Sequence, residues 1–150
     1  MNTGQVKDYV REHFGRVGIP TSMLDLYLEA GRLLIEQQQN FWWMAAASPA
    51  LLSTVINEGD YTIADAGGDI TITRFKDLRA LHYKISSDTA WREIDIGPYT
   101  KPELDLDYPD ATKGPPESAT LEDVTLFIYP QAPQLIYNMR LYFYRYTSGG

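Results

Sequence analysis

The chain has 150 residues, of which 44% are hydrophobic and none is cysteine, so it can form a folded core but no disulfide or thiolate metal site. Its formal net charge is −7 and its 13 Lys and Arg residues are scattered, which makes it a poor candidate for binding nucleic acid in bulk. No apolar run approaches the length of a membrane span, so we expect no membrane partner.

Two amphipathic helices are predicted in residues 1–46. The first is expected over residues 3–17, where apolar residues recur at the spacing of one helix face. These residues are Val6, Val10, Phe14 and Val17. The second helix is expected from about Met23 to about Trp43, with Thr21 or Ser22 as its N-cap. Its apolar stripe is wide, so we expect this helix to be covered on more than one side.

After Pro49 the apolar residues alternate, which indicates strands. The predicted strands are 52–56, 61–63, 70–73, 78–85, 91–96, 124–129 and 136–146. Residues 97–116 hold five prolines and an acidic stretch, which predicts a long loop with one helical turn near 102–106.

Helices followed by strands are typical of an α+β fold. We predict a single domain over residues 1–150, with a helical part (1–46) and a β-rich part (47–150). In this fold the helix pair packs on an antiparallel β-sheet or a small β-sandwich.

We found no set of residues that would support catalysis. The two histidines, His13 and His82, lie on different predicted elements without another ligand at metal spacing. The acidic residues Glu103, Asp105 and Asp107 could offer oxygens to Ca²⁺, with Asp110 nearby, but the central Gly and terminal Glu of an EF-hand loop are missing. A solvated loop held by its leucines is the simpler interpretation. We therefore expect no enzyme activity, no catalytic residue, no cofactor and no bound metal.

The most unusual segment is the tyrosine-rich strand from Gln134 to Tyr146. Alternate residues divide it into two faces. One face carries Tyr137, Met139, Leu141, Phe143 and Arg145 and is expected to be core. The other face carries Ile136, Asn138, Arg140, Tyr142, Tyr144 and Tyr146. The helices cover this second face, or part of it contacts another subunit, with tyrosines as contact groups; both can hold for different ends of the strand.

Several segments follow one another in an order that matches a known family pattern. They are Trp42-Trp43, the strand and turn from Leu51 to Tyr61, Gly114-Pro115-Pro116, residues 126–133 (LFIYPQAP) and residues 139–146 (MRLYFYRY). In this order the chain resembles tailed-phage head-to-tail adaptor (connector) proteins of the SU10 adaptor-like family.

The resemblance implies a structural virion protein of the phage neck. Such an adaptor forms a homo-oligomeric ring, expected to be a dodecamer, between the portal protein and the tail or nozzle proteins. Genomic DNA passes through its lumen without sequence-specific binding, and an acidic lumen would suit sliding DNA. The interface candidates are Trp42, Trp43, Tyr129, Arg140, Tyr142, Tyr144 and Tyr146.

Two alternatives remain open from the sequence. One is a tail-completion or stopper protein, which belongs to the same structural class. The other is a carbohydrate- or Ca²⁺-binding β module, in which exposed Trp and Tyr side chains would stack on sugars.

Overall fold

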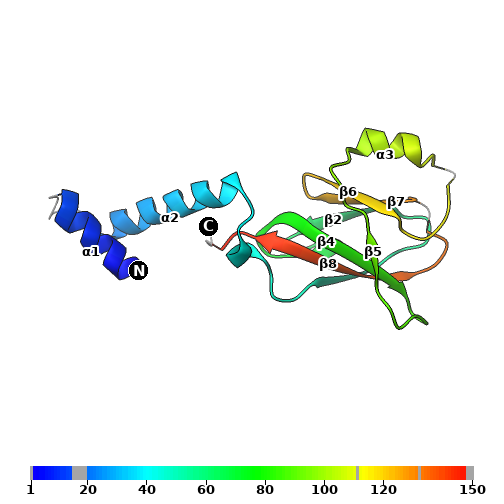
Figure 1. Ribbon diagram of the computed structural model, residues 1–150, viewed down its shortest axis with the longest axis horizontal. Coiled ribbons are helices and arrows are strands. Elements are labelled where there is room, and N and C mark those ends of the chain that lie inside the picture. Colours follow the sequence, from blue (N-terminus) through cyan, green and yellow to red (C-terminus); the bar gives the residue numbers. More distant parts are fainter. Residues whose placement is uncertain (1, 15–19, 111, 132, 148–150) are drawn as a thin grey trace. The chain divides into compact units, whose positions relative to one another are not determined.

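The computed structural model describes residues 2–14, 20–110, 112–131 and 133–147 (Figure 1). Helices occupy the first part of the chain and two β-sheets the rest, so the predicted α+β class is confirmed. The chain divides into two compact units, and the boundary between them along the sequence lies between Asn40 and Phe41. The predicted change from the helical to the β-rich part was at residue 46. Each unit is described by itself, and packing of the helix pair on a sheet stays a prediction.

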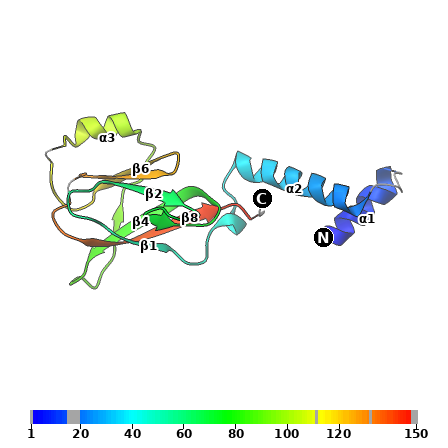
Figure 2. The same ribbon diagram turned by 180° about the vertical axis from the view of Figure 1, so that it is seen from behind.

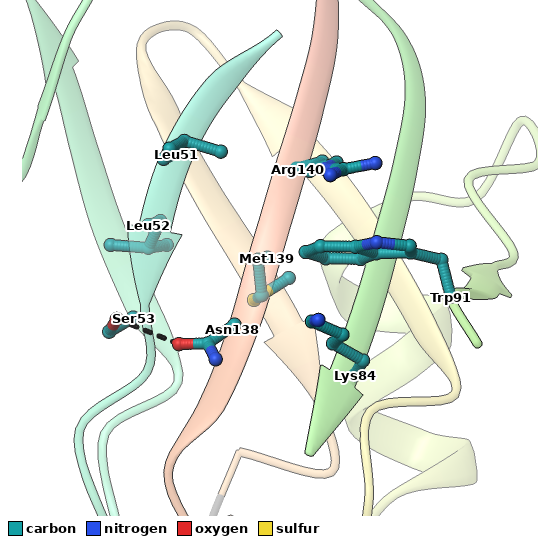
Figure 3. A pocket seen from close by; sticks show the side chains of 8 residues that line it. All are labelled: Leu51, Leu52, Ser53, Lys84, Trp91, Asn138, Met139 and Arg140. Atoms are coloured by element: carbon teal, nitrogen blue, oxygen red, sulfur yellow. Dashed lines mark hydrogen bonds between the residues drawn. The ribbon is translucent and has the colours of Figure 1, made fainter. Parts of the chain in front are cut away.

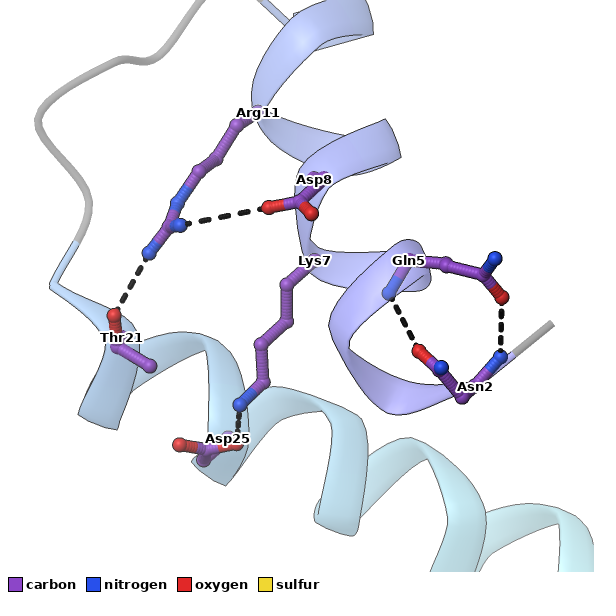
Figure 4. Close-up of polar contacts among 7 residues, drawn as sticks. All are labelled: Asn2, Gln5, Lys7, Asp8, Arg11, Thr21 and Asp25. Atoms are coloured by element: carbon purple, nitrogen blue, oxygen red, sulfur yellow. Dashed lines mark hydrogen bonds and ion pairs between the residues drawn. The ribbon is translucent and has the colours of Figure 1, made fainter.

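The first unit contains the helices α1 (Thr3–Phe14) and α2 (Thr21–Gln38). Polar contacts join them, as Figure 4 shows: Lys7 forms an ion pair with Asp25, and Arg11 donates a 2.8 Å hydrogen bond to the Thr21 hydroxyl. At the start of α1, the Asn2 backbone amide donates a 2.8 Å hydrogen bond to the Gln5 side-chain oxygen, and the Gln5 backbone amide donates one of 3.0 Å to the Asn2 side-chain oxygen. This reciprocal pair satisfies amide groups that a helix start leaves without partners.

The N-terminus of α2 differs from its prediction. Neither Thr21 nor Ser22 caps it, because Pro20 occupies the N-cap position without a side-chain hydrogen bond. The Thr21 hydroxyl instead accepts the hydrogen bond from Arg11. The last predicted residues of the first helix, 15–17, lie outside the described residues.

The C-terminus of α2 also differs from the prediction. The helix ends at Gln38, because Gln39 is extended with φ −158° and ψ 169°. Trp42–Met44 form a separate 3-10 helix, η1. Leu26 is 67% and Leu34 is 62% exposed, and the expected cover of this helix on more than one side stays a prediction. No described helix is both long and apolar enough to cross a bilayer.

The second unit is a sandwich of two four-stranded sheets (Figures 1 and 2). The first sheet has the order β1-β8-β4-β5, and the second has the order β3-β2-β7-β6. The first sheet consists of β1 (Ala50–Ser53), β8 (Tyr137–Arg145), β4 (Phe75–Ile85) and β5 (Arg92–Ile94). The second consists of β3 (Ile70–Thr71), β2 (Asp60–Ala64), β7 (Thr125–Tyr129) and β6 (Ser118–Glu122). All neighbouring strands are antiparallel except β2 and β3.

The longest ladder joins β4 and β8. It runs from Ile85 opposite Tyr137 to Phe75 opposite Arg145, with two irregularities near the Phe75 end. Side chains alternate along β8, so the predicted core face is buried at four positions. These are Tyr137, Met139, Leu141 and Phe143. The predicted inward face of the tyrosine-rich strand is therefore confirmed for these residues.

The second sheet closes the core from the other side. Its buried side chains include Tyr61, Ile63, Leu126 and Ile128. The Tyr61 hydroxyl accepts a 3.0 Å hydrogen bond from the Val55 amide and donates a 2.9 Å hydrogen bond to the Glu58 carbonyl. Burial raises the pKa of Tyr61. Tyr61 thus fills the core and fixes the turn before its own strand.

Two elements of the region 97–122 were not predicted fully. The single helical turn near 102–106 is a helix of seven residues, α3 (Lys101–Asp107). Strand β6 was not predicted because SATLE has small residues and no strong apolar alternation. Its Ser118, Ala119 and Thr120 are nevertheless all buried, which shows that β6 is covered on both of its faces.

Shortening a core side chain tests the sandwich. We expect Leu126→Ala to lower the free energy of unfolding by about 2–5 kcal/mol, because Leu126 is fully buried between the sheets. In the unassembled monomer, the matched control Leu106→Ala should change it by no more than about 0.5 kcal/mol, since Leu106 is 84% exposed there. Urea unfolding followed by circular dichroism measures both values. Equal losses would contradict this core.

Candidate functional site

The outer face of the first sheet, which points away from the sandwich core, is the candidate site. On β8 this face carries four half-buried side chains, Asn138, Arg140, Tyr142 and Tyr144. The strand register places Leu51 and His82 on either side of Arg140, and Glu93 beyond His82. Residues from four strands therefore form one row across this face.

Trp91, which precedes β5, is the central residue of this face. Its ring lies between two cations, as Figure 3 shows. The Arg140 guanidinium is 4.0 Å from the indole centre, and the Lys84 ammonium is 5.1 Å from it. These distances are typical of cation–π contacts, which stabilise the positions of all three side chains.

A pocket with a volume of about 320 Å³ opens beside Trp91. We call it the cationic pocket, and its lining residues are Leu51, Leu52, Ser53, Lys84, Trp91, Asn138, Met139 and Arg140 (Figure 3). Two of these residues are basic and none is acidic. Within the described chain, neither Lys84 nor Arg140 forms an ion pair with a carboxylate. The pocket is therefore a local site of positive charge on an acidic protein.

The tyrosines of β8 make further contacts beside this pocket. The rings of Tyr142 and His82 have centres 5.1 Å apart. Tyr144 forms a β-bridge with Ala45, and the Ala46 amide donates a 3.0 Å hydrogen bond to the Phe143 carbonyl. The segment that follows η1 thus pairs with the end of β8 and leaves Tyr144 only half-buried.

The other predicted interface residues lie in three different places. Trp42 is 83% exposed and meets Trp43 edge to face, with ring centres 6.0 Å apart. Tyr146 is half-buried, and the Lys76 ammonium lies 5.7 Å from its ring centre. Tyr129 is fully buried, so its selection as a surface contact was wrong. It packs beneath α3, where its ring lies 5.8 Å from that of Tyr108.

Trp91 and Lys84 were not selected from the sequence. The signal that could have identified them is the register of the β4–β5 hairpin. Tyr83 pairs with Arg92, so Trp91, just before β5, and Lys84, the next residue of β4, share the opposite face. Reading that register from the sequence would have placed Trp91 beside Lys84.

Helix α3 lies over the second sheet, on the other side of the sandwich (Figures 1 and 2). Its N-terminus has a complete capping box between Thr100 and Glu103, which lowers the pKa of the Glu103 carboxyl through hydrogen bonds from Thr100. Leu104 is the buried residue of α3. The Asp105 carboxylate accepts a 2.7 Å hydrogen bond from Lys101 and another of 2.7 Å from the Tyr129 hydroxyl. The short helix is therefore held in one position on the sheet.

The exposed side of α3 combines acidic and apolar groups. A shallow groove with a volume of about 500 Å³ runs over it, lined by Pro98, Tyr99, Glu103, Leu106 and Asp107. We call Tyr99, Glu103, Leu106 and Asp107 the acidic ridge. Asp107 forms no ion pair with any residue that the structure describes.

The acidic segment does not form a metal site in the described parts of the chain. No group of three or more His, Cys, Asp or Glu side chains there is placed to hold a metal ion. Two of the four acidic residues have other partners, because Glu103 closes the capping box and Asp105 binds Lys101 and Tyr129.

No protein-family model matches this chain, and no curated protein matches it. Any assignment of function therefore depends on the surfaces described above and on the resemblance in sequence order.

Acid should weaken the attachment of α3. Hydrogen bonds from Lys101 and then from Tyr129 lower the pKa of Asp105, so its stabilising contribution is present above its unfolded pKa and is lost as pH falls through the folded value. We expect the difference in unfolding free energy between wild type and Asp105→Asn to be constant above about pH 5 and to shrink below about pH 4. Urea unfolding at a series of pH values measures it.

The companion variant Tyr129→Phe removes one of the two donors to Asp105. We therefore expect Asp105→Asn to lower the unfolding free energy by less in the Tyr129→Phe background than in the wild-type background. A difference that stays the same at pH 3 and pH 7 would show that Asp105 does not hold α3.

Proposed function

We propose that this chain is a structural, non-enzymatic subunit of a tailed-phage neck. In this proposal it is a head-to-tail adaptor that forms a homo-oligomeric ring, a dodecamer, between the portal protein and the tail or nozzle proteins. The observation that carries the proposal is the outer face of the first sheet, where aromatic and basic side chains are ordered but left half-exposed. Tyr, Trp and Arg, which this face carries, are enriched in protein interfaces and in their energetic hot spots.

The helical unit supports an assembly role independently. On α2 the large apolar residues Leu26, Tyr27 and Leu34 are each more than 60% exposed. With Met23 and Leu33 they lie at spacings of three, four and seven residues, which place them on one helix face. A contiguous apolar face on a soluble chain usually marks a contact with another protein.

The charge of the chain is compatible with DNA passing through such a ring. With a net charge of −7, a lumen built from this protein would repel the phosphate backbone rather than hold it. In the proposal, genomic DNA therefore passes without sequence-specific contact.

A carbohydrate-binding module is supported less well. Stacking on a sugar needs an open aromatic face, whereas both faces of Trp91 are in contact with cations. A Ca²⁺-binding module is also supported less well, since two of its proposed carboxylate ligands, Glu103 and Asp105, already have partners. Neither point affects the highly exposed Trp42, which an assembly interface would cover.

Ring formation is the direct test of the proposal. The purified chain, alone and mixed with the portal protein encoded by the same genome, would be measured by light scattering and by electron microscopy. We expect closed rings, with the portal shifting assembly to lower protein concentration. A chain that stays monomeric at all concentrations and does not bind the portal would contradict the proposal.

Two aromatic substitutions separate assembly from folding. We expect Trp42→Ala and Tyr144→Ala each to raise the protein concentration needed for half-assembly by about ten-fold or more, because both remove exposed aromatic surface. The unfolding free energy of the monomer should fall by less than the assembly free energy. Equal losses for Tyr144→Ala would favour a purely structural role in the sheet.

The matched control is Val124→Ala. Val124 is 41% exposed in the turn between β6 and β7, away from the first sheet. This variant should assemble like wild type. A similar loss of assembly in the control would mean that the aromatic variants act through general destabilisation.

A further inference from the structure

Two surfaces of the sandwich are complementary in charge and in apolar character. The cationic pocket carries Lys84 and Arg140, neither of which is neutralised by a described carboxylate. The acidic ridge carries Glu103 and Asp107 beside Leu106, which is 84% exposed. Each surface therefore has the charge that the other lacks.

The apolar parts of the two surfaces also correspond. The exposed apolar group of the cationic pocket is Leu51, which is 73% exposed, whereas Leu52 and Met139 pack toward the core. On the ridge, Leu106 lines the same groove as the two acidic residues. One contact between the surfaces could bury both exposed leucines and pair the charges.

The two surfaces lie on opposite sides of the sandwich. The pocket opens on the outer face of the first sheet, and α3 covers the outer face of the second (Figures 1 and 2). Because the core separates these faces, the ridge of a chain cannot reach its own pocket. A second copy of the chain can supply it.

We propose that the cationic pocket of one subunit binds the acidic ridge of the next subunit. In this contact Leu106 packs against Leu51, and Asp107 pairs with Lys84 or Arg140. The inference rests on the proposed homo-oligomeric ring and names the contact that builds it. The contact is heterologous, since it joins two different surfaces, and repeated heterologous contacts close into a ring when the rotation per subunit permits.

The structure favours a second copy over other anionic partners. DNA is a polyanion that a chain of net charge −7 repels, and a pocket of about 320 Å³ accepts only a few side chains. An apolar side next to two cations suits an acidic segment that also presents a leucine. The acidic ridge of this chain has that composition and is already rigid, because the capping box and Asp105 hold α3 in place.

Disulfide cross-linking tests the contact directly, because the chain has no cysteine of its own. Two pairs of single variants are used: Ser53→Cys with Leu106→Cys, and Leu51→Cys with Asp107→Cys. Mixing the two members of a pair under mild oxidation should give a reducible heterodimer that neither member gives with itself. A chain carrying both changes of a pair should give a ladder of higher oligomers. Failure of both pairs to cross-link overturns the proposal.

A charge exchange tests the same contact without oxidation. Lys84→Glu and Asp107→Lys should each raise the concentration for half-assembly by about ten-fold at low salt, since each places like charges opposite one another. Combining both changes in one chain should restore assembly to within about three-fold of wild type, because the charges are then exchanged rather than opposed. Absence of restoration counts against the contact when circular dichroism shows that the combined variant is folded.

The outcomes separate this contact from the proposed function. If rings form although no pair cross-links and the charge variants assemble like wild type, the adaptor proposal stands and this interface is overturned. Specific cross-linking in a protein that forms open filaments and never binds the portal would support the interface and contradict the adaptor role.

Discussion

The pairing of β4 with β8 is the constraint on which the sandwich and its surfaces depend. Once Leu141 is fixed opposite Leu81 in the core, alternation along the strand decides the direction of every neighbouring side chain. Four large side chains of β8 then point inward, and Arg140, Tyr142 and Tyr144 must point outward. A slip of one residue would bury a guanidinium and expose the core. The candidate site is therefore a direct result of the register that stabilises the fold.

Much of the fold could be predicted because its main strands alternate clearly. Strand β8 and its inward face, β4, and the helical start of the chain follow from residue spacing alone. Strand β6 could not be found in this way, because its small side chains are buried by α3 on one face and by the core on the other. The end of α2 was missed because Phe41 and the two tryptophans continue an apolar pattern. Phe41 and Trp43 instead stack with ring centres 4.2 Å apart, and Trp42 meets Trp43 edge to face.

The candidate site could be predicted only in part. Arg140 and the tyrosines follow from the alternation of one strand, but the position of Trp91 between Lys84 and Arg140 depends on three segments that meet only after folding. Tyr129 shows the opposite error. Its place at the end of a hydrophobic strand was compatible with a surface role, yet α3 covers it and Asp105 binds its hydroxyl. Helix α3, which covers Tyr129, belongs to a proline-rich segment for which the sequence predicts mainly a loop.

The lengths of the outermost strands have a consequence for how this protein meets its partners. The strands at the ends of the two sheets are β1, β5, β3 and β6, and none is longer than five residues. Short edges offer few free backbone amides and carbonyls, so they are poor templates for an added strand. Copies of the sandwich are thus protected from joining edge to edge into a continuous sheet. Side chains on the broad faces, rather than the backbone, would then decide which partner is accepted and how readily it is released.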